Sequence, residues 1–494
     1  MVFILKRIKK EVFLETNNCQ RKGWLLRNEK GLADLSLAEK FRMEEGIAIG
    51  EKARELFPGG VLVHERSIDD AARKTSELLA DPSVRIIFES SFVHNEYATK
   101  ADVLIRSGDS WELIEVKSKT TRKRPKSELS ELIDDIAYTA LITVKNGVEL
   151  SNMRLMLVSE KFELGIEISR LFETFDYTRE VKNRITEFEK LLEPYAEVTS
   201  QSKEPDFRII NECKKCDFFD HCIPASEECT IFDIPRIQEK QLLELYAKKI
   251  FHVKDIPQSF TLTPTQKIPV ECMRSGEIIV DTGLGAELKK VKWPAHYLDF
   301  ETTQTAYPLY PNVAPQEKIP TQYSIHICSE CGKILDHKEF LADPTRDCRR
   351  ELAVKLINDL EGQGTILAYY STFEKKIIEG LITRYPDLEE PLKSIISRLL
   401  DLMECSKCVN HPKFKGSNSI KDVLPALVPG MSYKGMSIAN GEDASVIFAY
   451  MALGKFTPEE CTRIREDMLR YCELDTFAMV KIHDVFEKMA NVKK

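Results

Sequence analysis

The chain has 494 residues, of which 43% are hydrophobic and 30% are charged, and its formal net charge is −8. At roughly 100–200 residues per domain, about two to four domains are expected, and the composition excludes a disordered, collagenous or disulfide-stapled protein. No apolar run reaches the roughly 18 residues of a membrane-spanning helix, so we expect a cytoplasmic protein with no membrane partner. Its thirteen cysteines favour reduced thiols or metal ligands over disulfides.

The first part of the chain has an α/β pattern. Residues 44–57 form an amphipathic helical pattern, and alternating runs rich in Val and Ile predict strands over 84–93, 100–106, 111–118 and 153–160. A basic loop and a helix are expected over 120–135, and further charged helix over 168–198. A cysteine-rich segment and a helical connector over 226–292 follow, which places a domain boundary near Pro294.

The pattern of strands restarts after Pro294 and predicts a second α/β domain. We expect a strand over 296–303, a strand pair within 321–342, a helix over 350–362 and a further strand over 364–370. Helices dominate the remaining sequence.

Two carboxylates and a lysine are brought together in the first domain by a predicted hairpin. The segment ADVLIRSGDSWELIEVKSKT places Asp102 on one strand, and Glu115 and Lys117 two residues apart on the next. Two carboxylates can hold Mg²⁺ or Mn²⁺ against a phosphoryl oxygen, while a lysine orients water or steadies the developing charge. An isolated E-x-K triplet is more often a solvated strand, but the preceding Asp102 and the apolar residues around Glu115 favour phosphodiester cleavage.

A cysteine cluster lies at the far end of the same domain. Cys213, Cys216 and Cys222 form C-x2-C-x5-C, and Cys19 upstream can complete a four-thiolate metal site. Three unrelated thiols, or a zinc site that uses His221 or Cys229, are the alternatives.

The triad and the cysteines together resemble the iron-sulfur RecB-like nucleases of the PD-(D/E)XK superfamily, over roughly residues 12–224. The resemblance implies a restriction-endonuclease-like domain over 1–225 with catalytic Asp102, Glu115 and Lys117. It also implies a [4Fe-4S] cluster on Cys19, Cys213, Cys216 and Cys222.

This chain departs from that family at two positions. Gly50 stands where those enzymes carry a metal-binding His, and Thr139 stands where the Gln of a Gln-x3-Tyr motif is expected. Glu44, Glu45 or Glu51 can supply the missing ligand. The alternative is a first domain that only clamps DNA.

The second domain contains two short motifs with acidic residues, one of which includes a tyrosine, and a separate glutamate. In HYLDFETT, Asp299 and Glu301 lie two apart on a strand and share a face, and in LRYCELDTFAMV, Tyr471 and Asp475 share a helix face. Glu374 falls in the first turn of the helix that follows the strand over 364–370. Each motif alone is common by chance, and buried like charges repel unless a cation joins them.

Taken in this order, these motifs resemble the DEDD 3′–5′ exonucleases of the ribonuclease H-like fold, in the variant whose last motif contains a tyrosine. The resemblance covers about residues 293–490. It implies that Asp299, Glu301, Glu374 and Asp475 bind two divalent metals and that Tyr471 positions the attacking water. In that family the middle acid is an Asp preceded by an Asn, whereas YYSTFE offers Glu374.

The expected architecture is therefore α/β, with a PD-(D/E)XK domain over 1–225, a helical connector over 226–292 and an exonuclease-like domain over 293–494. The whole chain resembles a prokaryotic family of two-nuclease proteins. We expect a metal-dependent nuclease acting on single-stranded DNA or DNA ends, with RNA as the alternative substrate. A nucleic-acid-binding scaffold and a zinc-stapled adaptor are the competing functions.

Some cysteines and histidines are expected to be packing or solvent-facing residues and not metal ligands. Cys328 with Cys331, and Cys405 with Cys408, can form a four-cysteine zinc site, but their separation in sequence favours no metal. His296 and His326 are expected to pack or face solvent. The basic loop TTRKRPKS beside Lys117 is expected to contact phosphate.

Overall fold

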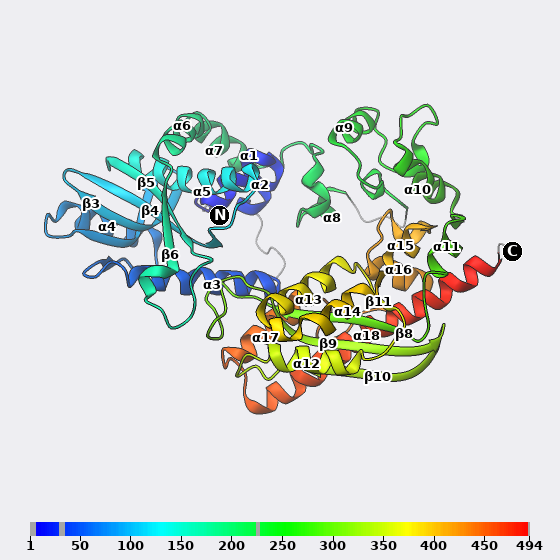
Figure 1. Cartoon of the computed structure of the whole chain (residues 1–494). Coiled ribbons are helices and arrows are strands. Elements are labelled where there is room, and N and C mark those ends of the chain that lie inside the picture. Colours follow the sequence, from blue (N-terminus) through cyan, green and yellow to red (C-terminus); the bar gives the residue numbers. More distant parts are fainter. Residues whose placement is uncertain (1–5, 29–34, 224–227, 493–494) are drawn as a thin grey trace. The chain divides into compact units, whose positions relative to one another are not determined.

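The computed structural model describes residues 6–28, 35–223 and 228–492. The chain divides into two compact units, Met1–Arg208 with Thr305–Glu317, and Ile209–Gln304 with Lys318–Lys494 (Figure 1). Both units combine helices with a mixed sheet, which confirms the expected α/β class. Residues 226–292, predicted as a connector, fall within the second unit.

The first unit is built on a six-stranded sheet with the order β1-β2-β3-β4-β5-β6. Strands β2, β3 and β4 are antiparallel neighbours, whereas β4 and β5 run parallel because α5 crosses between them. The strands are β1 (Val61–Leu62), β2 (Ile86–His94), β3 (Tyr97–Ser107), β4 (Ser110–Thr120), β5 (Leu150–Val158) and β6 (Phe172–Asp176). The helices are α1 (Lys10–Asn18), α2 (Gln20–Asn28), α3 (Leu37–Arg54), α4 (Ile68–Ala80), α5 (Lys126–Lys145), α6 (Thr178–Glu189) and α7 (Leu192–Ser200).

Helices cover both faces of this sheet because successive strand residues point to opposite sides. Leu113 of β4 packs in a core with residues of α5, and its neighbour Ile114 packs in a second core with residues of α3. Glu115 and Lys117 have the same parity as Leu113, so the strand presents them on the α5 side.

One predicted helix is wrong in part. The segment over 168–198 begins with a 3₁₀ turn (Ile168–Leu171) and strand β6, and only then becomes helical in α6 and α7. Strand β6 pairs antiparallel with β5, from Val158 opposite Phe172 to Arg154 opposite Asp176. The open edge of the sheet supplies backbone partners that favour a strand in this charged sequence.

The second unit is built on a five-stranded sheet with the order β10-β9-β8-β11-β12. Strands β8, β9 and β10 are antiparallel, and β11 and β12 run parallel to β8. The strands are β8 (Ala295–Thr303), β9 (Ile319–Glu330), β10 (Lys333–Leu341), β11 (Ile366–Ala368) and β12 (Leu399–Asp401), and a separate pair joins β7 (Ile279–Val280) to β13 (Val409–Asn410).

Two layers of helices enclose the main sheet of this unit. Leu298 and Phe300 pack with α12 to α14 on one face, while Tyr297 packs with α17 and α18 on the other. The helices are α8 (Phe219–Cys222), α9 (Glu239–Ala247), α10 (Pro264–Ser275), α11 (Leu284–Leu288), α12 (Arg349–Asp359), α13 (Thr372–Arg384), α14 (Glu389–Ser397), α15 (Met403–Lys407), α16 (Ile420–Leu427), α17 (Gly441–Ala452) and α18 (Pro458–Val492).

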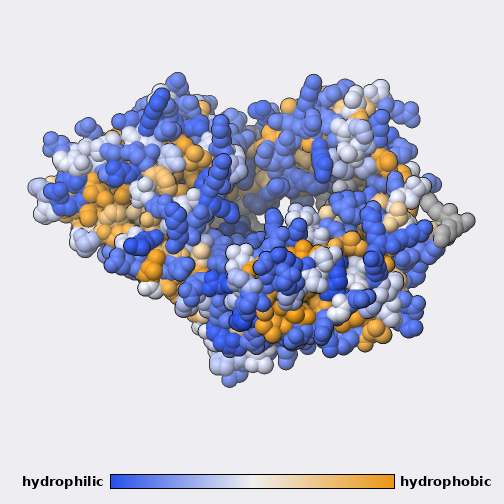
Figure 2. Space-filling model, in the orientation of Figure 1, coloured by the Kyte–Doolittle hydropathy of each residue, from blue (hydrophilic) through white to orange (hydrophobic). Residues whose placement is uncertain are grey.

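On the face in Figure 2, hydrophilic residues predominate and hydrophobic residues form only small patches (Figure 2). Within the described ranges, no helix has both the length and the apolar character needed to cross a bilayer.

Candidate metal and phosphodiester sites

Three carboxylates of the second unit converge on the face of the sheet that α18 covers. Asp299 and Glu301 lie on β8, opposite Ser324 and Gln322 of β9, and Asp475 comes from α18. The three side chains each offer an oxygen within 4.8 Å of the others. The D-x-E spacing achieves this because residues two apart on a strand share a face.

The fourth predicted acid, Glu374, lies in the first turn of α13, directly after β11. It is 2% exposed, and its Oε2 has no hydrogen-bond partner among the described residues. The turn before it is held by Asp401, whose carboxylate accepts hydrogen bonds from the backbone N–H groups of Tyr370 (2.9 Å) and Ser371 (3.2 Å). A buried carboxylate oxygen without a donor is costly unless a cation or a proton offsets it.

Burial raises the pKa of all four carboxyl groups, and repulsion from nearby carboxylates adds to the shift of Asp299, Glu301 and Glu374. Burial, followed by Asp475, Glu301 and Glu374, holds the pKa of Asp299 well above its usual range. Burial also raises the pKa of Glu301 and of Glu374 to about 8, with added repulsion from neighbouring carboxylates. Burial raises that of Asp475 to about 6, against the opposing charge of Lys421. This donor set of hard, crowded oxygens fits divalent cations such as Mg²⁺ or Mn²⁺.

Two tyrosines surround Asp475. The Tyr433 hydroxyl donates a hydrogen bond of 2.5 Å to Asp475 Oδ1, and a hydrogen bond with Tyr471 also lowers the Asp475 pKa. Both rings are buried, with their centroids 5.9 Å apart. Tyr471 therefore lies at the position predicted for it, one helical turn before Asp475.

The sequence analysis missed Tyr433, Lys421 and Gly441. The positive charge of Lys421 lowers the pKa of both Glu301 and Asp475, so it lies near the cluster. A Cβ built on Gly441 would lie 3.2 Å from Glu301 Oε2, so a larger residue there would require the Glu301 carboxylate to shift. No spacing rule connects these residues to the acids, because they lie in the loops and helix starts between β13 and α17.

In the first unit, Asp102, Glu115 and Lys117 come together as predicted from the hairpin. Val103 of β3 pairs with Ile114 of β4, which sets Asp102 beside Glu115. Asp102 Oδ2 accepts a hydrogen bond of 2.7 Å from the N–H of Val116. Lys117 Nζ lies 2.9 Å from Glu115 Oε1.

Two residues that the sequence analysis did not select complete this cluster. Lys10 of α1 places its Nζ 2.5 Å from Glu115 Oε1 and 3.0 Å from Asp135 Oδ2, and Asp135 of α5 also pairs with Lys117. Burial and Asp102 raise the pKa of Glu115 to about 7 in spite of the two lysines. Glu115 Oε2 is buried without a partner among the described residues, so this site also retains an oxygen for a cation.

Gly50 and Thr139, the two departures from the RecB-like pattern, lie on α3 and α5. A Cβ on Gly50 of α3 would meet no atom within 4 Å, and Thr139 of α5 is buried, with its hydroxyl 3.4 Å from the carbonyl of Asp135. Among the substitute ligands, Glu45 accepts a hydrogen bond from the Ala306 N–H, and Glu51 lies 3.8 Å from Arg54. Glu44 is exposed on α3. None of the three is among the groups that act on the pKa of Asp102 or Glu115.

The four cysteines assigned to an iron-sulfur cluster are divided between the units. Cys19 follows the last residue of α1, whereas Cys213 lies within a 3₁₀ turn (Asn211–Lys215), Cys216 directly follows that turn and Cys222 ends α8. The N–H of Ile210 donates to Cys213 Sγ at 3.4 Å. An amide donor to a thiolate sulfur is a common device for tuning such clusters.

The alternative cysteine sets show no compact zinc geometry. Within the described chain, no three sulfur atoms of Cys328, Cys331, Cys405 and Cys408 lie within 4.8 Å of one another. Cys229 Sγ instead contacts the carbonyl of Pro412 at 3.6 Å.

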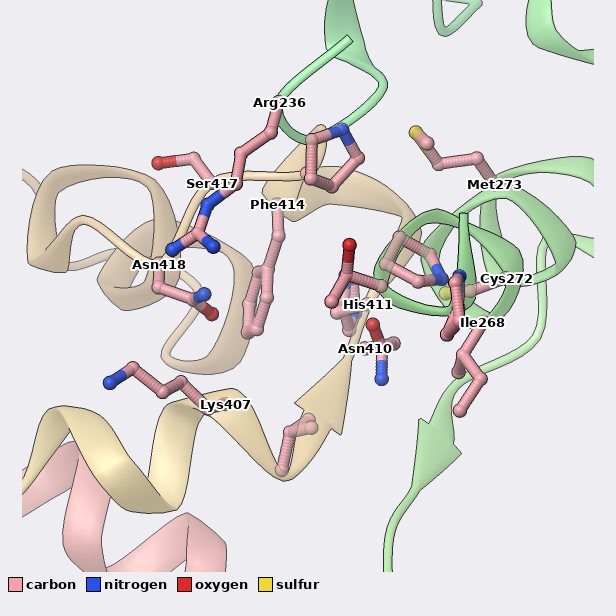
Figure 3. A pocket seen from close by; sticks show the side chains of 16 residues that line it. Arg236, Ile268, Cys272, Met273, Lys407, Asn410, His411, Phe414, Ser417 and Asn418 are labelled. Carbon is pink, nitrogen blue, oxygen red and sulfur yellow. The ribbon is translucent and has the colours of Figure 1, made fainter. Parts of the chain in front are cut away.

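A pocket of about 320 Å³ lies in the second unit between α10 and the segment after α15. Figure 3 shows Arg236, Lys407 and Asn418 on one side of Phe414, with Ile268 and Cys272 on the other side (Figure 3). Arg236 and Lys407 are exposed, and their positive charges suit a phosphate backbone, whereas the Phe414 ring is buried and stacks on His411.

Comparison with known proteins gives relatives but no activity. A family model described as "Domain of unknown function (DUF2779)" matches residues 296–419, which include β8 and α13. The chain is 23% identical over 220 residues to "Uncharacterized protein MG366" of Mycoplasma genitalium, and 26% identical over 230 residues to "Uncharacterized protein UU173" of Ureaplasma parvum. These matches cover 39% and 42% of this chain, and about a third of each relative (32% and 33%).

Proposed function

We propose that the protein is a metal-dependent nuclease whose second unit removes nucleotides from nucleic-acid ends. The observation that carries this proposal is the cluster of Asp299, Glu301 and Asp475, from β8 and α18, with Glu374 of α13 near enough to raise the pKa of Asp299 and Glu301. Four carboxyl groups with raised pKa values have no evident structural purpose, because apolar residues would stabilise the fold better.

The topology supports a ribonuclease H-like assignment for this unit. Its sheet combines three antiparallel strands with two strands parallel to the first, in the order β10-β9-β8-β11-β12. The first strand carries the D-x-E motif, the helix after the fourth strand carries Glu374, and the last helix carries Tyr471 and Asp475. This is the order of motifs that the DEDD resemblance requires.

The chain's own residues have distinct tasks in this proposal. Asp299, Glu301, Glu374 and Asp475 would hold two divalent ions, which when bound activate the attacking water and stabilise charge on the phosphoryl group. Tyr471 orients that water for in-line attack, so that the new P–O bond forms as the bond to the leaving nucleotide oxygen breaks. Tyr433 fixes the rotamer of Asp475 through its hydrogen bond. Lys421 offsets part of the negative charge when metal is absent.

The first unit supports a PD-(D/E)XK assignment on similar grounds. The β2-β3-β4 hairpin strands, the α5 crossover and parallel β5 place Asp102, Glu115 and Lys117 on one face. Asp102 and Glu115 would hold a cation, and Lys117 would orient water. For the [4Fe-4S] cluster that the resemblance implies, Cys19 of the first unit and Cys213, Cys216 and Cys222 of the second unit have the donor chemistry, and Cys213 accepts an N–H hydrogen bond.

Degradation assays test this function. End-labelled single- and double-stranded DNA and RNA are incubated with the protein and Mg²⁺, Mn²⁺ or EDTA, using the parent, Asp299→Ala, Lys117→Ala and the double variant. We expect metal-dependent stepwise loss of single-stranded DNA that Asp299→Ala abolishes. Binding without cleavage on every substrate would replace the nuclease with a nucleic-acid-binding scaffold.

A further inference from the structure

We propose that His326, His337 and Glu473 form a binding site for a borderline transition-metal ion of the Zn²⁺ class. His326 of β9 and His337 of β10 are register partners, so their side chains leave the sheet on the same face. Their ring centroids lie 4.5 Å apart. Glu473 of α18 adds a carboxylate, and each residue offers one ligand atom within 4.8 Å of the others.

The imidazoles are oriented by contacts to their second ring nitrogens. His326 Nδ1 lies 2.8 Å from Thr476 Oγ1, and His337 Nε2 lies 2.9 Å from Ser324 Oγ. The two hydroxyl groups are 2.7 Å apart, which links both contacts into one network. Metal-binding histidines commonly fix their outer nitrogen in this way, which leaves the inner nitrogen for the ion.

The donor set determines the class of ion. Two imidazoles and one carboxylate suit Zn²⁺ and its neighbours Co²⁺ and Ni²⁺, whereas Mg²⁺ prefers a shell of oxygens. Three protein ligands leave one coordination position for water. Glu473 is exposed and His337 is half-buried, so the ion has a route from solvent to His326.

Such an ion would bind to α18, the helix that also carries Tyr471 and Asp475. Glu473 and Thr476 belong to the same two turns of α18 as Tyr471 and Asp475, but they face β9 and β10. A bound ion would fasten the edge strand β10 to β9 and to α18. It would therefore stabilise the second unit without using any of the four acids assigned to phosphodiester hydrolysis.

Zinc retention tests the proposal without an activity assay. The full-length protein is loaded with Zn²⁺, dialysed against excess Mg²⁺ and analysed for bound zinc by atomic spectroscopy. His337→Ala and Glu473→Gln are compared with His64→Ala, a control at an exposed histidine of the first unit. Zinc held by cysteines or by the other carboxylates is common to all four proteins and cancels in the difference.

We expect the parent and His64→Ala to retain one more zinc per chain than His337→Ala. Glu473→Gln, which changes an exposed residue and leaves the fold intact, should weaken zinc binding at least about tenfold. Zinc should also raise the melting temperature of the parent more than that of His337→Ala. Equal zinc content in the parent and both site variants would overturn the proposal.

Discussion

Asp475 interacts with most other residues of the second-unit cluster. Its carboxylate lies beside Asp299 and Glu301 and accepts a hydrogen bond from Tyr433. Burial raises its pKa only to about 6, below the values of Glu301 and Glu374, because the tyrosines and Lys421 oppose the shift. These partners therefore favour the ionised form of Asp475.

Removing the Tyr433 hydroxyl should weaken the site while leaving the fold intact. In Tyr433→Phe, Asp475 loses a charge-assisted hydrogen bond and can rotate. Such partners are worth about 10–100-fold in metal affinity or activity, so we expect the Mg²⁺ requirement and the cleavage rate to change by that factor. Tyr385→Phe, at a half-buried ring of the other core in the unit, is the control. Unchanged Mg²⁺ dependence in Tyr433→Phe would show that this hydrogen bond is structural only.

Residues joined by a local spacing rule were predictable, and those joined only by tertiary packing were not. The two-residue spacing in β8 and β4 and the four-residue spacing in α18 place side chains on one face without knowledge of the fold. Lys10 reaches Glu115 from 105 positions away, and no pattern in the sequence connects them. His326 was expected to pack or face solvent, because its register partner His337 is visible only once β9 and β10 are aligned.

Helix α1 carries a lysine of the first-unit cluster at one end and is followed by a cysteine at the other. It begins at Lys10, which pairs with Glu115 and Asp135, and it is followed directly by Cys19. Lys10 thus supplies positive charge where a cation is expected. A cation that binds Glu115 has to displace or share this ammonium group.

Lys10→Met should make the first unit depend on metal for stability. The variant leaves Glu115 and Asp135 with only Lys117, so we expect its melting temperature in EDTA to fall by about 2–6 °C. Mg²⁺ should then stabilise Lys10→Met more than the parent, because the competing cation is gone. Lys145→Met removes a surface ion pair with Glu189 and is the matched control. An identical Mg²⁺ shift in parent and variant would exclude competition between Lys10 and metal.

Helix α10 and the residues after α15 form the pocket that contains Arg236 and Lys407. If this pocket contacts the phosphate backbone, Arg236→Ala should weaken DNA binding similarly for all sequences. The slope of log affinity against log salt should decrease by about one. Lys333→Ala changes a 68% exposed lysine at the start of β10 and should leave the slope unchanged. Fluorescence anisotropy at several salt concentrations gives both values, and equal slopes for Arg236→Ala and the parent would place the nucleic acid elsewhere.

Strands and helices with clear periodicity were predictable, and the elements that depend on their neighbours were not. The alternating runs predicted β2 to β5 and β8 to β11, and all of these strands except β10 bury apolar side chains. Strand β6 was predicted as helix, since its charged sequence becomes a strand only beside the edge of β5. The sheet orders were also beyond the sequence, because strand pairing is a tertiary property.

The buried carboxyl groups of the second unit should make the free energy of unfolding of the protein depend on both pH and bound metal. The pKa of Glu301 and of Glu374 rises from 4.5 to about 8 on folding. A carboxyl group with a raised folded pKa contributes stability below pH 4.5 and loses that contribution as the pH rises through about 8. Without metal, the unfolding free energy should therefore fall between about pH 5 and pH 9.

Mg²⁺ should reverse this loss, because the cation takes the place of the protons. The rise in melting temperature that Mg²⁺ causes should be larger at about pH 8.5 than at about pH 6. The double variant Glu301→Gln/Glu374→Gln should show a flatter pH profile and a smaller Mg²⁺ effect. A metal-free melting temperature that rises over this pH range would contradict the assignment of these acids as a cation site.

The most direct test follows one strand of DNA from each end. A single-stranded oligonucleotide labelled at its 5′ end or at its 3′ end is digested with Mg²⁺ by the parent, Asp299→Asn and the exposed control Asp336→Asn. We predict that the parent and the control shorten the 5′-labelled strand in single-nucleotide steps and release the 3′ label at once, and that Asp299→Asn does neither. A ladder that persists in Asp299→Asn would show that the carboxylates of the second unit do not hydrolyse the strand.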